Sequence, residues 1–184
     1  ASMTNPQDFT KLCNTVFTAL YGFGFQVIDG TRGDEGVDGY VQSEKRILAM
    51  YCPIKPEKKT DKDYADKICS DMRKAYDLCH KKGFPVEAWS FVTPRKLGAG
   101  VIELMLKTAA EYGLKANHLE ATYIAGVLYE HEHLIQEFPY LDVPRLASLM
   151  REVIARVDAQ GARTPEQTAD PSRSTGTRPG SADL

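Results

Sequence analysis

The segment Arg46–Cys52, RILAMYC, constrains the fold of this chain more than any other. Its apolar residues fall at consecutive positions, so both faces of a strand formed here would be apolar. That pattern is typical of a central strand covered on both sides. Pro53 and Pro56 follow, and proline ends a strand because it cannot donate a ladder hydrogen bond. The segment is therefore predicted to be the middle strand of a sheet between helical layers.

The flanking segments predict the remaining elements. Residues 5–21 carry apolar side chains at the i, i+3, i+4, i+7 spacing of an amphipathic helix, with Asn5 as cap. A second helix is expected to begin at Thr60 or Asp61. Strands are expected at 25–29, 37–42, 46–52, 86–94 and 114–120, and further helices at 101–112, 121–138 and 143–157. The predicted class is α/β, with an αβββαβ core, a mixed central sheet and additional C-terminal helices.

Composition separates one folded unit from a tail. Residues 4–158 are predicted to form a single domain, because 42% hydrophobic content supports a core. Residues 159–184 are predicted to be a disordered tail or linker, since the sequence from Gln160 contains no Ile, Val, Phe, Tyr or Trp. The four cysteines lack metal-binding spacing and are expected to be reduced core thiols.

Charge and hydropathy limit the function classes. A net charge of −2 argues against a globally basic nucleic-acid binder but allows a local basic patch. No apolar run approaches the roughly 20 residues of a membrane span, so no membrane association and a cytoplasmic location are expected.

A loop rich in glycine and acid, GTRGDEGVDGY, precedes the central strand and ends at Tyr40. Asp38 lies at the start of the second expected strand, where the hairpin can place it beside the third. An acid in this position can hold Mg²⁺, which activates water and neutralises charge on a scissile phosphate. The alternative is that Asp38 caps the glycine turn through backbone amides.

The segment FTALYGFGFQVIDGTRGDEGVDGYVQSEKRILAMYCP, residues 17–53, resembles the PD-(D/E)XK nuclease superfamily, closest to its Mrr-like restriction endonuclease branch. The resemblance covers roughly residues 8–94. It implies a restriction-endonuclease-like fold and a nuclease that uses Mg²⁺ or Mn²⁺ to hydrolyse phosphodiester bonds, with duplex DNA as the expected substrate. It further implies a role in restriction or antiphage defence, and allows a homodimer and a fused or associated NTPase or sensor module.

The same resemblance assigns site residues. Asp38 corresponds to the metal-binding aspartate, and Asp8 to an accessory acid on the first helix. Ala49 and Tyr51 occupy the positions of the glutamate or glutamine and of the lysine. An alternative function is therefore a catalytically degenerate domain of this fold, which would bind nucleic acid or associate with a protein.

Other residues could replace the missing groups. Asp34 or Glu35 could supply the second carboxylate, and Lys67, ahead of Lys55, the cation. Lys67 and Asp71 are four residues apart on one predicted helical face, where they would act together or form a solvent-exposed ion pair.

Basic residues gather in two expected loops, before the second helix and after the fourth strand. They are candidate phosphate contacts, and the alternative is a solvated charged loop. The residues are Lys55, Lys58, Lys59, Lys62, Arg95 and Lys96.

Overall fold

The computed structural model describes residues 5–28, 36–138, 148 and 151–156. Within them, one five-stranded sheet has the order β1-β2-β3-β4-β5. The strands are β1 (Phe25–Val27), β2 (Gly39–Val41), β3 (Arg46–Met50), β4 (Ala88–Val92) and β5 (Lys115–Leu119). The predicted α/β class with a mixed sheet is confirmed, and the predicted central strand lies in the middle of the sheet.

The sheet has an antiparallel part and a parallel part. β1, β2 and β3 pair antiparallel, with Phe25 opposite Val41 and Gly39 opposite Leu48. β3, β4 and β5 pair parallel, with Leu48 opposite Ser90 and Ser90 opposite Asn117. Parallel neighbours need a crossover connection, and helices α2 and α3 provide the two crossovers.

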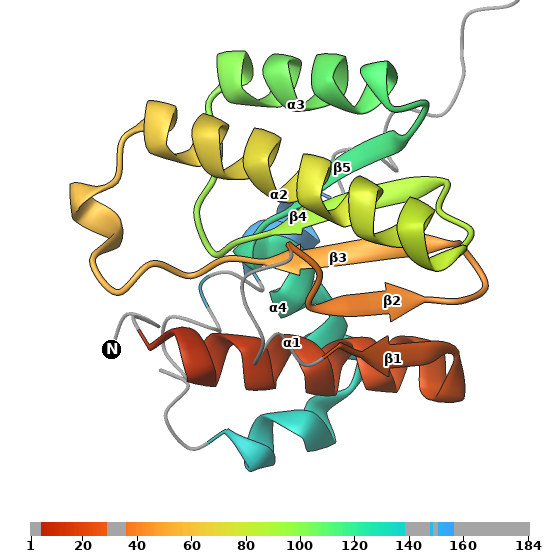
Figure 1. The fold of residues 1–184 in the computed structure, drawn as a ribbon. Coiled ribbons are helices and arrows are strands. Elements are labelled where there is room, and N and C mark those ends of the chain that lie inside the picture. The colour runs from red at the N-terminus through yellow and green to blue at the C-terminus, as the bar shows by residue number, and fades with distance from the viewer. Residues whose placement is uncertain (1–4, 29–35, 139–147, 149–150, 157–184) are drawn as a thin grey trace, which may run out of the picture.

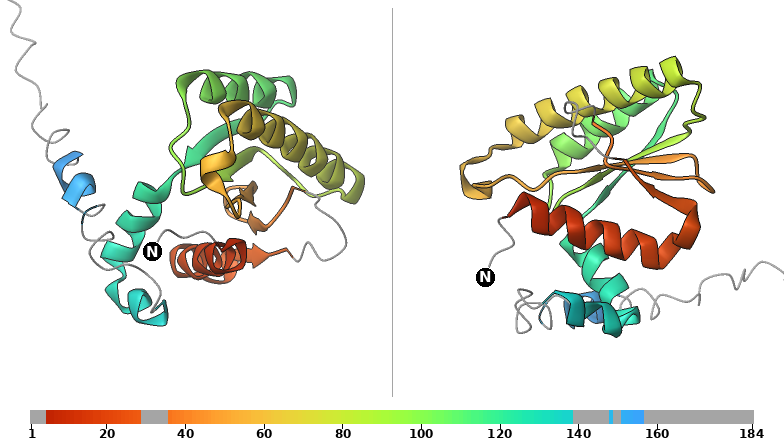
Figure 2. Two further views of the ribbon diagram at one scale, coloured as in Figure 1. Left: turned by 90° about the vertical axis from the view of Figure 1, so that its left-hand side faces the viewer. Right: turned by 60° about the horizontal axis from the view of Figure 1, so that its bottom comes forward.

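Helices cover both faces of the sheet (Figure 1). Figure 2 shows the same layers from two further directions. α2 (Asp61–Lys82) and α3 (Ala99–Glu111) lie on one face, and α1 (Pro6–Tyr21) and α4 (Ala121–Glu130) on the other. Each layer encloses its own buried cluster, one between α1, α4 and the sheet and one between α2, α3 and the sheet.

Local signals in the sequence set the helix ends. Asn5 caps α1, because its side chain accepts a hydrogen bond from the backbone N–H of Gln7, and Pro6 follows as first helical residue. Thr60 and Asp63 form a reciprocal capping box at the start of α2. Gly83 ends α2 in the left-handed conformation, at φ 71°.

The prediction of one helix over residues 121–138 is wrong. α4 ends at Glu130, and a 3₁₀ segment, η3 (Glu132–Glu137), follows it. His131 leaves the helical region at φ −126° and ψ 57°. The turn allows Leu134 and Phe138 to pack into the α1 core, so burial of two large side chains outweighs continuation of the helix.

The strands are shorter than predicted at their ends, and residues 148 and 151–156 are helical within the helix expected at 143–157. The predicted tail beyond Gln160 lies outside the described residues. Among those that are described, no helix has both the length and the apolarity to cross a bilayer.

One glycine holds the loop before β2 against α2. Gly36 has a φ of 70°, and a Cβ atom added to it would lie 2.5 Å from the carbonyl oxygen of Asp71 and 2.7 Å from its Cα. The clash is with helix backbone, which cannot rotate away. Only glycine therefore permits this approach, which sets where Asp38 enters the sheet.

Replacing Gly36 with alanine should lower the free energy of unfolding by more than about 2 kcal/mol, because it adds both a positive-φ strain and a backbone clash. Urea denaturation of wild type and variant measures this. Gly100→Ala is the control, since Gly100 lies in α3 with open space around it and should tolerate the methyl group. Equal stability of Gly36→Ala and wild type would contradict the contact.

Candidate functional site

The carboxyl ends of β3 and β4 lie at one edge of the sheet, because the two strands are parallel. The chain leaves β3 through the 3₁₀ segment η2 (Pro56–Lys58) into α2, and leaves β4 through a loop at residues 93–98 into α3. Both helices therefore begin at this edge. The carboxyl edge of a parallel sheet, with helix N-termini around it, is where open α/β folds bind their ligands.

Arg95 joins the two loops at this edge. Its guanidinium donates to the carbonyl oxygen of Lys59 at 2.6 Å and to Oδ1 of Asp61 at 2.7 Å. The guanidinium carbon of Arg95, Cζ, lies 4.8 Å from the centroid of the Tyr64 ring. The Asp61 carboxylate also approaches the start of α3, since a Cβ on Gly98 would lie 2.8 Å from its Oδ2. Arg95 thus holds the two loops together, and its guanidinium group is already paired with the Asp61 carboxylate.

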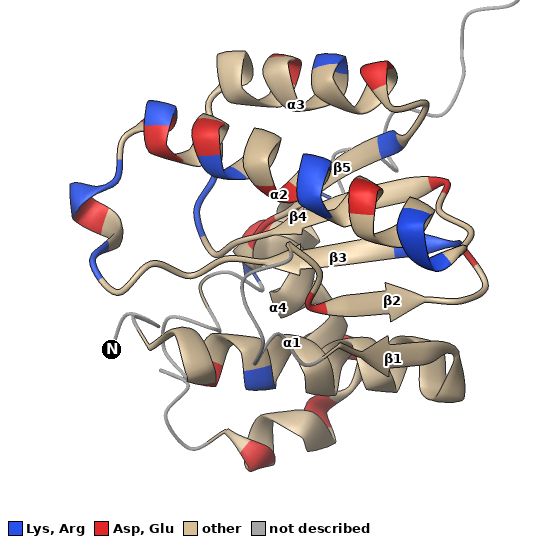
Figure 3. Cartoon of the chain, in the orientation of Figure 1, with Lys and Arg blue, Asp and Glu red and all other residues tan. Residues whose placement is uncertain are grey.

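The lysines near Arg95 differ in their contacts. Lys59 pairs with Asp63 at 3.7 Å. Among the described residues, four others are exposed and make no ion pair within 4 Å: Lys55, Lys58, Lys62 and Lys96. Figure 3 shows basic and acidic residues interleaved along η2 and the first turns of α2. The predicted basic set is therefore brought to one edge, with Arg95 and Lys59 engaged in the protein itself.

Asp38 precedes β2 and links three strands. Its backbone N–H donates to the carbonyl oxygen of Leu48 at 2.9 Å, and its carbonyl oxygen accepts from the backbone N–H of Ile28 at 3.0 Å. Its Oδ2 accepts a hydrogen bond from the backbone N–H of Met50 at 2.6 Å. The carboxylate therefore takes the place of a ladder acceptor at the end of β3. Met50 in β3 is thus one donor to this carboxylate, and the predicted capping of the glycine turn involves residues 29–35, which lie outside the described part of the chain.

The surroundings of the Asp38 carboxylate reach α1. The pKa of the buried Cys13 thiol is raised, first by burial and then by the negative charge of Asp38 and by Cys52. Met50 and Cys52 pack into the same cluster as Cys13. The β3 side chains on this face thus supply neither an oxygen ligand nor an ammonium group.

Ala49 and Tyr51 point to the opposite face. Ala49 is 1% exposed in the core under α2. Tyr51 packs edge-on against Tyr64 at a centroid distance of 5.5 Å. The two positions that the resemblance assigned to an acid and a lysine are therefore occupied by core side chains.

Lys67 extends from α2 toward Tyr51. Its Nζ lies 5.6 Å from the Tyr51 ring centroid and 3.0 Å from Oδ1 of Asp71. Asp71 is only 3% exposed, so the expectation of a solvent-exposed ion pair is wrong. Burial raises the pKa of the Tyr51 phenol, and the positive charge of Lys67 partly offsets this rise. An ammonium group from α2 thus occupies the space beside the position of the missing lysine.

The remaining acids do not complete a metal site among the described residues. Asp8 lies half-buried in the first turn of α1. Asp34 and Glu35 lie outside the described part of the chain. Within that part, no three His, Cys, Asp or Glu side chains are grouped so that they could hold a metal ion. Mg²⁺ prefers six oxygen ligands and usually takes at least one or two carboxylates. The described residues by themselves therefore do not form a Mg²⁺ site with three protein ligands.

The Lys67–Asp71 pair should be energetically coupled, because the Asp71 carboxylate is buried and a buried charge left without its partner is costly. A double-mutant cycle with Lys67→Met and Asp71→Asn should give a coupling of about 1 kcal/mol or more in urea denaturation. Lys59–Asp63 provides the matched pair in the same helical spacing, with both side chains 39% exposed. Its coupling should be much smaller, since water screens exposed pairs. Similar coupling in both cycles would contradict the importance of burial.

No family model matches this chain, and no curated protein or solved structure is significantly similar to it.

Proposed function

We propose that this chain is a nucleic-acid-binding domain of the restriction-endonuclease-like fold, which contacts the phosphodiester backbone of duplex DNA along the carboxyl edge of β3 and β4. The observation that carries the proposal is the pair of hydrogen bonds from Arg95 to Lys59 and Asp61. It joins two loops separated in sequence and leaves the exposed Lys55, Lys58, Lys62 and Lys96 around them.

The electrostatics of this edge favour an anionic polymer despite the net charge of −2. Two of its acids have partners, since Asp61 accepts from Arg95 and Asp63 accepts from Thr60, whereas Glu57 of η2 is exposed. The hydrogen bonds from Thr60 lower the pKa of the Asp63 carboxyl, as expected for a capping acid held by backbone and hydroxyl donors. The exposed lysines remain available to phosphates. Phosphate contacts of this kind give affinity without sequence preference.

The fold assignment has its own support. The order of elements is α1, β1, β2, β3, α2, β4, and β3 pairs antiparallel with β2 and parallel with β4. This is the αβββαβ order that the resemblance implies. The proposed binding edge lies where that resemblance expects the nucleic acid.

Changing Lys55, Lys58, Lys59 and Lys62 together to glutamate should abolish binding to duplex DNA, because the edge would become acidic. Wild-type affinity should fall steeply with salt, since each phosphate contact releases a counterion. Fluorescence anisotropy with a labelled duplex, at about 50 and 200 mM salt, measures both effects.

The matched control changes four exposed lysines far from this edge to glutamate, which alters the net charge equally: Lys81, Lys82, Lys107 and Lys115. It should retain most of the binding. Equal loss in both variants would show a general charge effect, and salt-independent wild-type binding would rule out the proposed edge.

Hydrolysis of the bound strand is the second candidate function, favoured by the position of Lys67. Its ammonium group reaches the Tyr51 ring, where the resemblance expects the lysine. Asp38 lies at the end of the β2–β3 pairing, where its carboxylate accepts a hydrogen bond from the backbone N–H of Met50. Together they would bring one carboxylate and one cation to the edge where the backbone binds.

If the domain is a nuclease, Asp38→Asn should abolish cleavage of DNA in Mg²⁺ or Mn²⁺ while binding persists. An asparagine oxygen can still accept from Met50, so the fold should remain intact by circular dichroism. Lys67→Ala should lower the rate by about 10²-fold or more, the scale of one lost transition-state charge contact. Wild-type protein that binds DNA but leaves single- and double-stranded substrates uncut would instead support a binding domain without this activity.

A further inference from the structure

β5 is an edge strand whose outer backbone groups bond to no other strand of the described sheet. Lys115 donates its N–H to the carbonyl oxygen of Glu87 at 3.0 Å. The carbonyl oxygen of Leu119 accepts a hydrogen bond at 3.1 Å from the N–H of the residue that follows β4. Backbone groups alternate in direction along a strand, so Ala116 and His118 turn their N–H and C=O groups away from β4. No backbone group of the described residues bonds to them there.

β5 also lacks most of the features by which proteins protect an exposed edge. It has five residues, whereas the opposite edge strand, β1, has three. It contains no proline, and its one residue with a permanent charge, Lys115, stands at its first position. Short strands, prolines and charged side chains keep other chains from adding to a sheet. The β5 edge is therefore open to a further strand.

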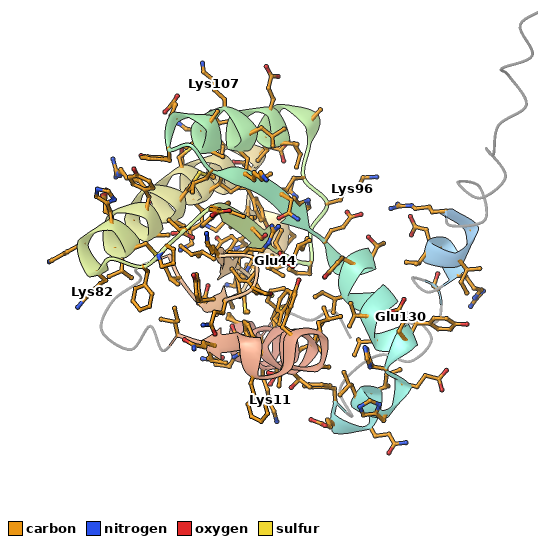
Figure 4. The ribbon with its side chains drawn as sticks, turned by 90° about the vertical axis from the view of Figure 1, so that its right-hand side faces the viewer. Lys11, Glu44, Lys82, Lys96, Lys107 and Glu130 are labelled. Carbon is orange, nitrogen blue, oxygen red and sulfur yellow. The ribbon has the colours of Figure 1, made fainter. Side chains whose placement is uncertain are left out.

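An apolar stripe on α3 lies beside this edge. Ile102, Leu106 and Ala110 recur at every fourth position, so they share one side of the helix. Leu106 is 49% exposed. Ile102 and Leu106 border the same hollow as Ala116, which places the stripe on the β5 side of α3. Figure 4 shows α3 above β5, with Lys96 projecting from the loop that leads into the helix. Neighbouring exposed apolar residues of this kind mark interaction surfaces.

Two charged residues of opposite sign accompany the stripe. Glu103 and Lys107 are both exposed, and although they lie four residues apart in α3, no ion pair joins them. A second α3 that ran in the opposite direction would reverse their order, so that Glu103 of each copy came opposite Lys107 of the other. The charges beside the stripe are therefore complementary to those of a second copy of the same helix.

We propose that β5 pairs with β5 of a second copy of this chain, antiparallel and about a two-fold axis at Asn117, so that the two sheets become continuous. In this register Ala116 of one copy lies opposite His118 of the other, and the two residues exchange two hydrogen bonds. The axis repeats this pair, so the open groups of both strands are bonded. Residues opposite one another in an antiparallel pair lie on the same side of a sheet, so the two α3 helices come side by side and antiparallel.

The dimer is independent of the proposed DNA-binding edge. Because the two β5 strands run in opposite directions, the carboxyl edges of the two sheets lie at opposite ends of the joint sheet. The variant with the lysines of the loop before α2 changed to glutamate should therefore still dimerise: Lys55, Lys58, Lys59 and Lys62. Failure to bind DNA would then not be mistaken for failure of this interface.

Sedimentation velocity over a concentration series measures the association, and wild type should form a dimer. Ala116→Pro should weaken the dimer by about tenfold or more, because proline removes an edge donor from each of the two strands. Circular dichroism and melting temperature should stay close to wild type, since this N–H makes no bond to β4. A wild type that stays monomeric, or a folded Ala116→Pro variant that dimerises with unchanged affinity, overturns the proposal.

The two exposed leucines of α3 provide a matched pair of variants. Leu106 belongs to the stripe, and Leu104, which is 37% exposed, lies two residues away on roughly the opposite side of the helix. Leu106→Glu should weaken the dimer by about tenfold or more, because it puts a carboxylate from each copy into an apolar contact. Leu104→Glu should leave it nearly unchanged. An equal effect of the two variants overturns the placement of α3.

A charge exchange tests the antiparallel arrangement. Glu103→Lys should weaken the dimer about threefold, because the new lysine comes opposite Lys107 of the other copy. The double variant, Glu103→Lys with Lys107→Glu, should recover wild-type affinity, since each pair is again of opposite sign. A double variant that associates no better than Glu103→Lys alone overturns the arrangement.

Amide hydrogen exchange identifies what occupies the edge. The N–H groups of Ala116 and His118 should exchange slowly in the wild-type dimer and rapidly in the Leu106→Glu monomer, where they face water. Slow exchange of both groups in a protein that is monomeric would assign the edge to another part of the same chain, and would overturn the second copy as its occupant.

Discussion

The parallel pairing of β3 with β4 is the constraint on which the rest of this structure depends. Parallel strands cannot be joined by a hairpin, so the chain must cross back over the sheet through α2. The crossover brings the ends of both strands, and the starts of α2 and α3, to one edge. Arg95 can then bridge to Lys59 and Asp61 across a sequence separation of more than thirty residues.

Asp38 combines a structural contact with a chemically suitable position. It satisfies the Met50 amide at the end of the sheet, where strand pairing stops, and thereby holds β2 on β3. Asp38 is only partly buried there, beside the proposed binding edge. The same geometry serves a binding domain and a nuclease, and the two differ in whether further acids and a cation reach this carboxylate.

Arg95 also connects the loop after β4 to the loop before α2. Its side chain donates to the carbonyl oxygen of Lys59 and to the Asp61 carboxylate, and so holds the basic loop before α2. The short loop after β4 thus sets the position of the lysines around it.

The sequence by itself determined the class and the order of elements. Two-sided apolarity of Arg46–Met50, helical periodicity around Phe9 and Leu12, and capping residues such as Thr60 are local signals, and they predict local structure. Asp38 and the lysines of the loop before α2 were also predicted to be candidate site residues, because they lie beside these elements in the sequence. The predicted ends were less accurate because packing sets them, as in η3, where Leu134 and Phe138 turn toward α1.

Tertiary structure alone decided which of these residues meet. The close approach of Gly36, in the loop before β2, to the backbone of Asp71 in α2 is one such contact. The engagement of Arg95 with Lys59 and Asp61 likewise has no signal in the sequence. Such contacts join segments that are far apart along the chain, and short-range spacing carries no information on them because it describes only neighbours in one helix or strand.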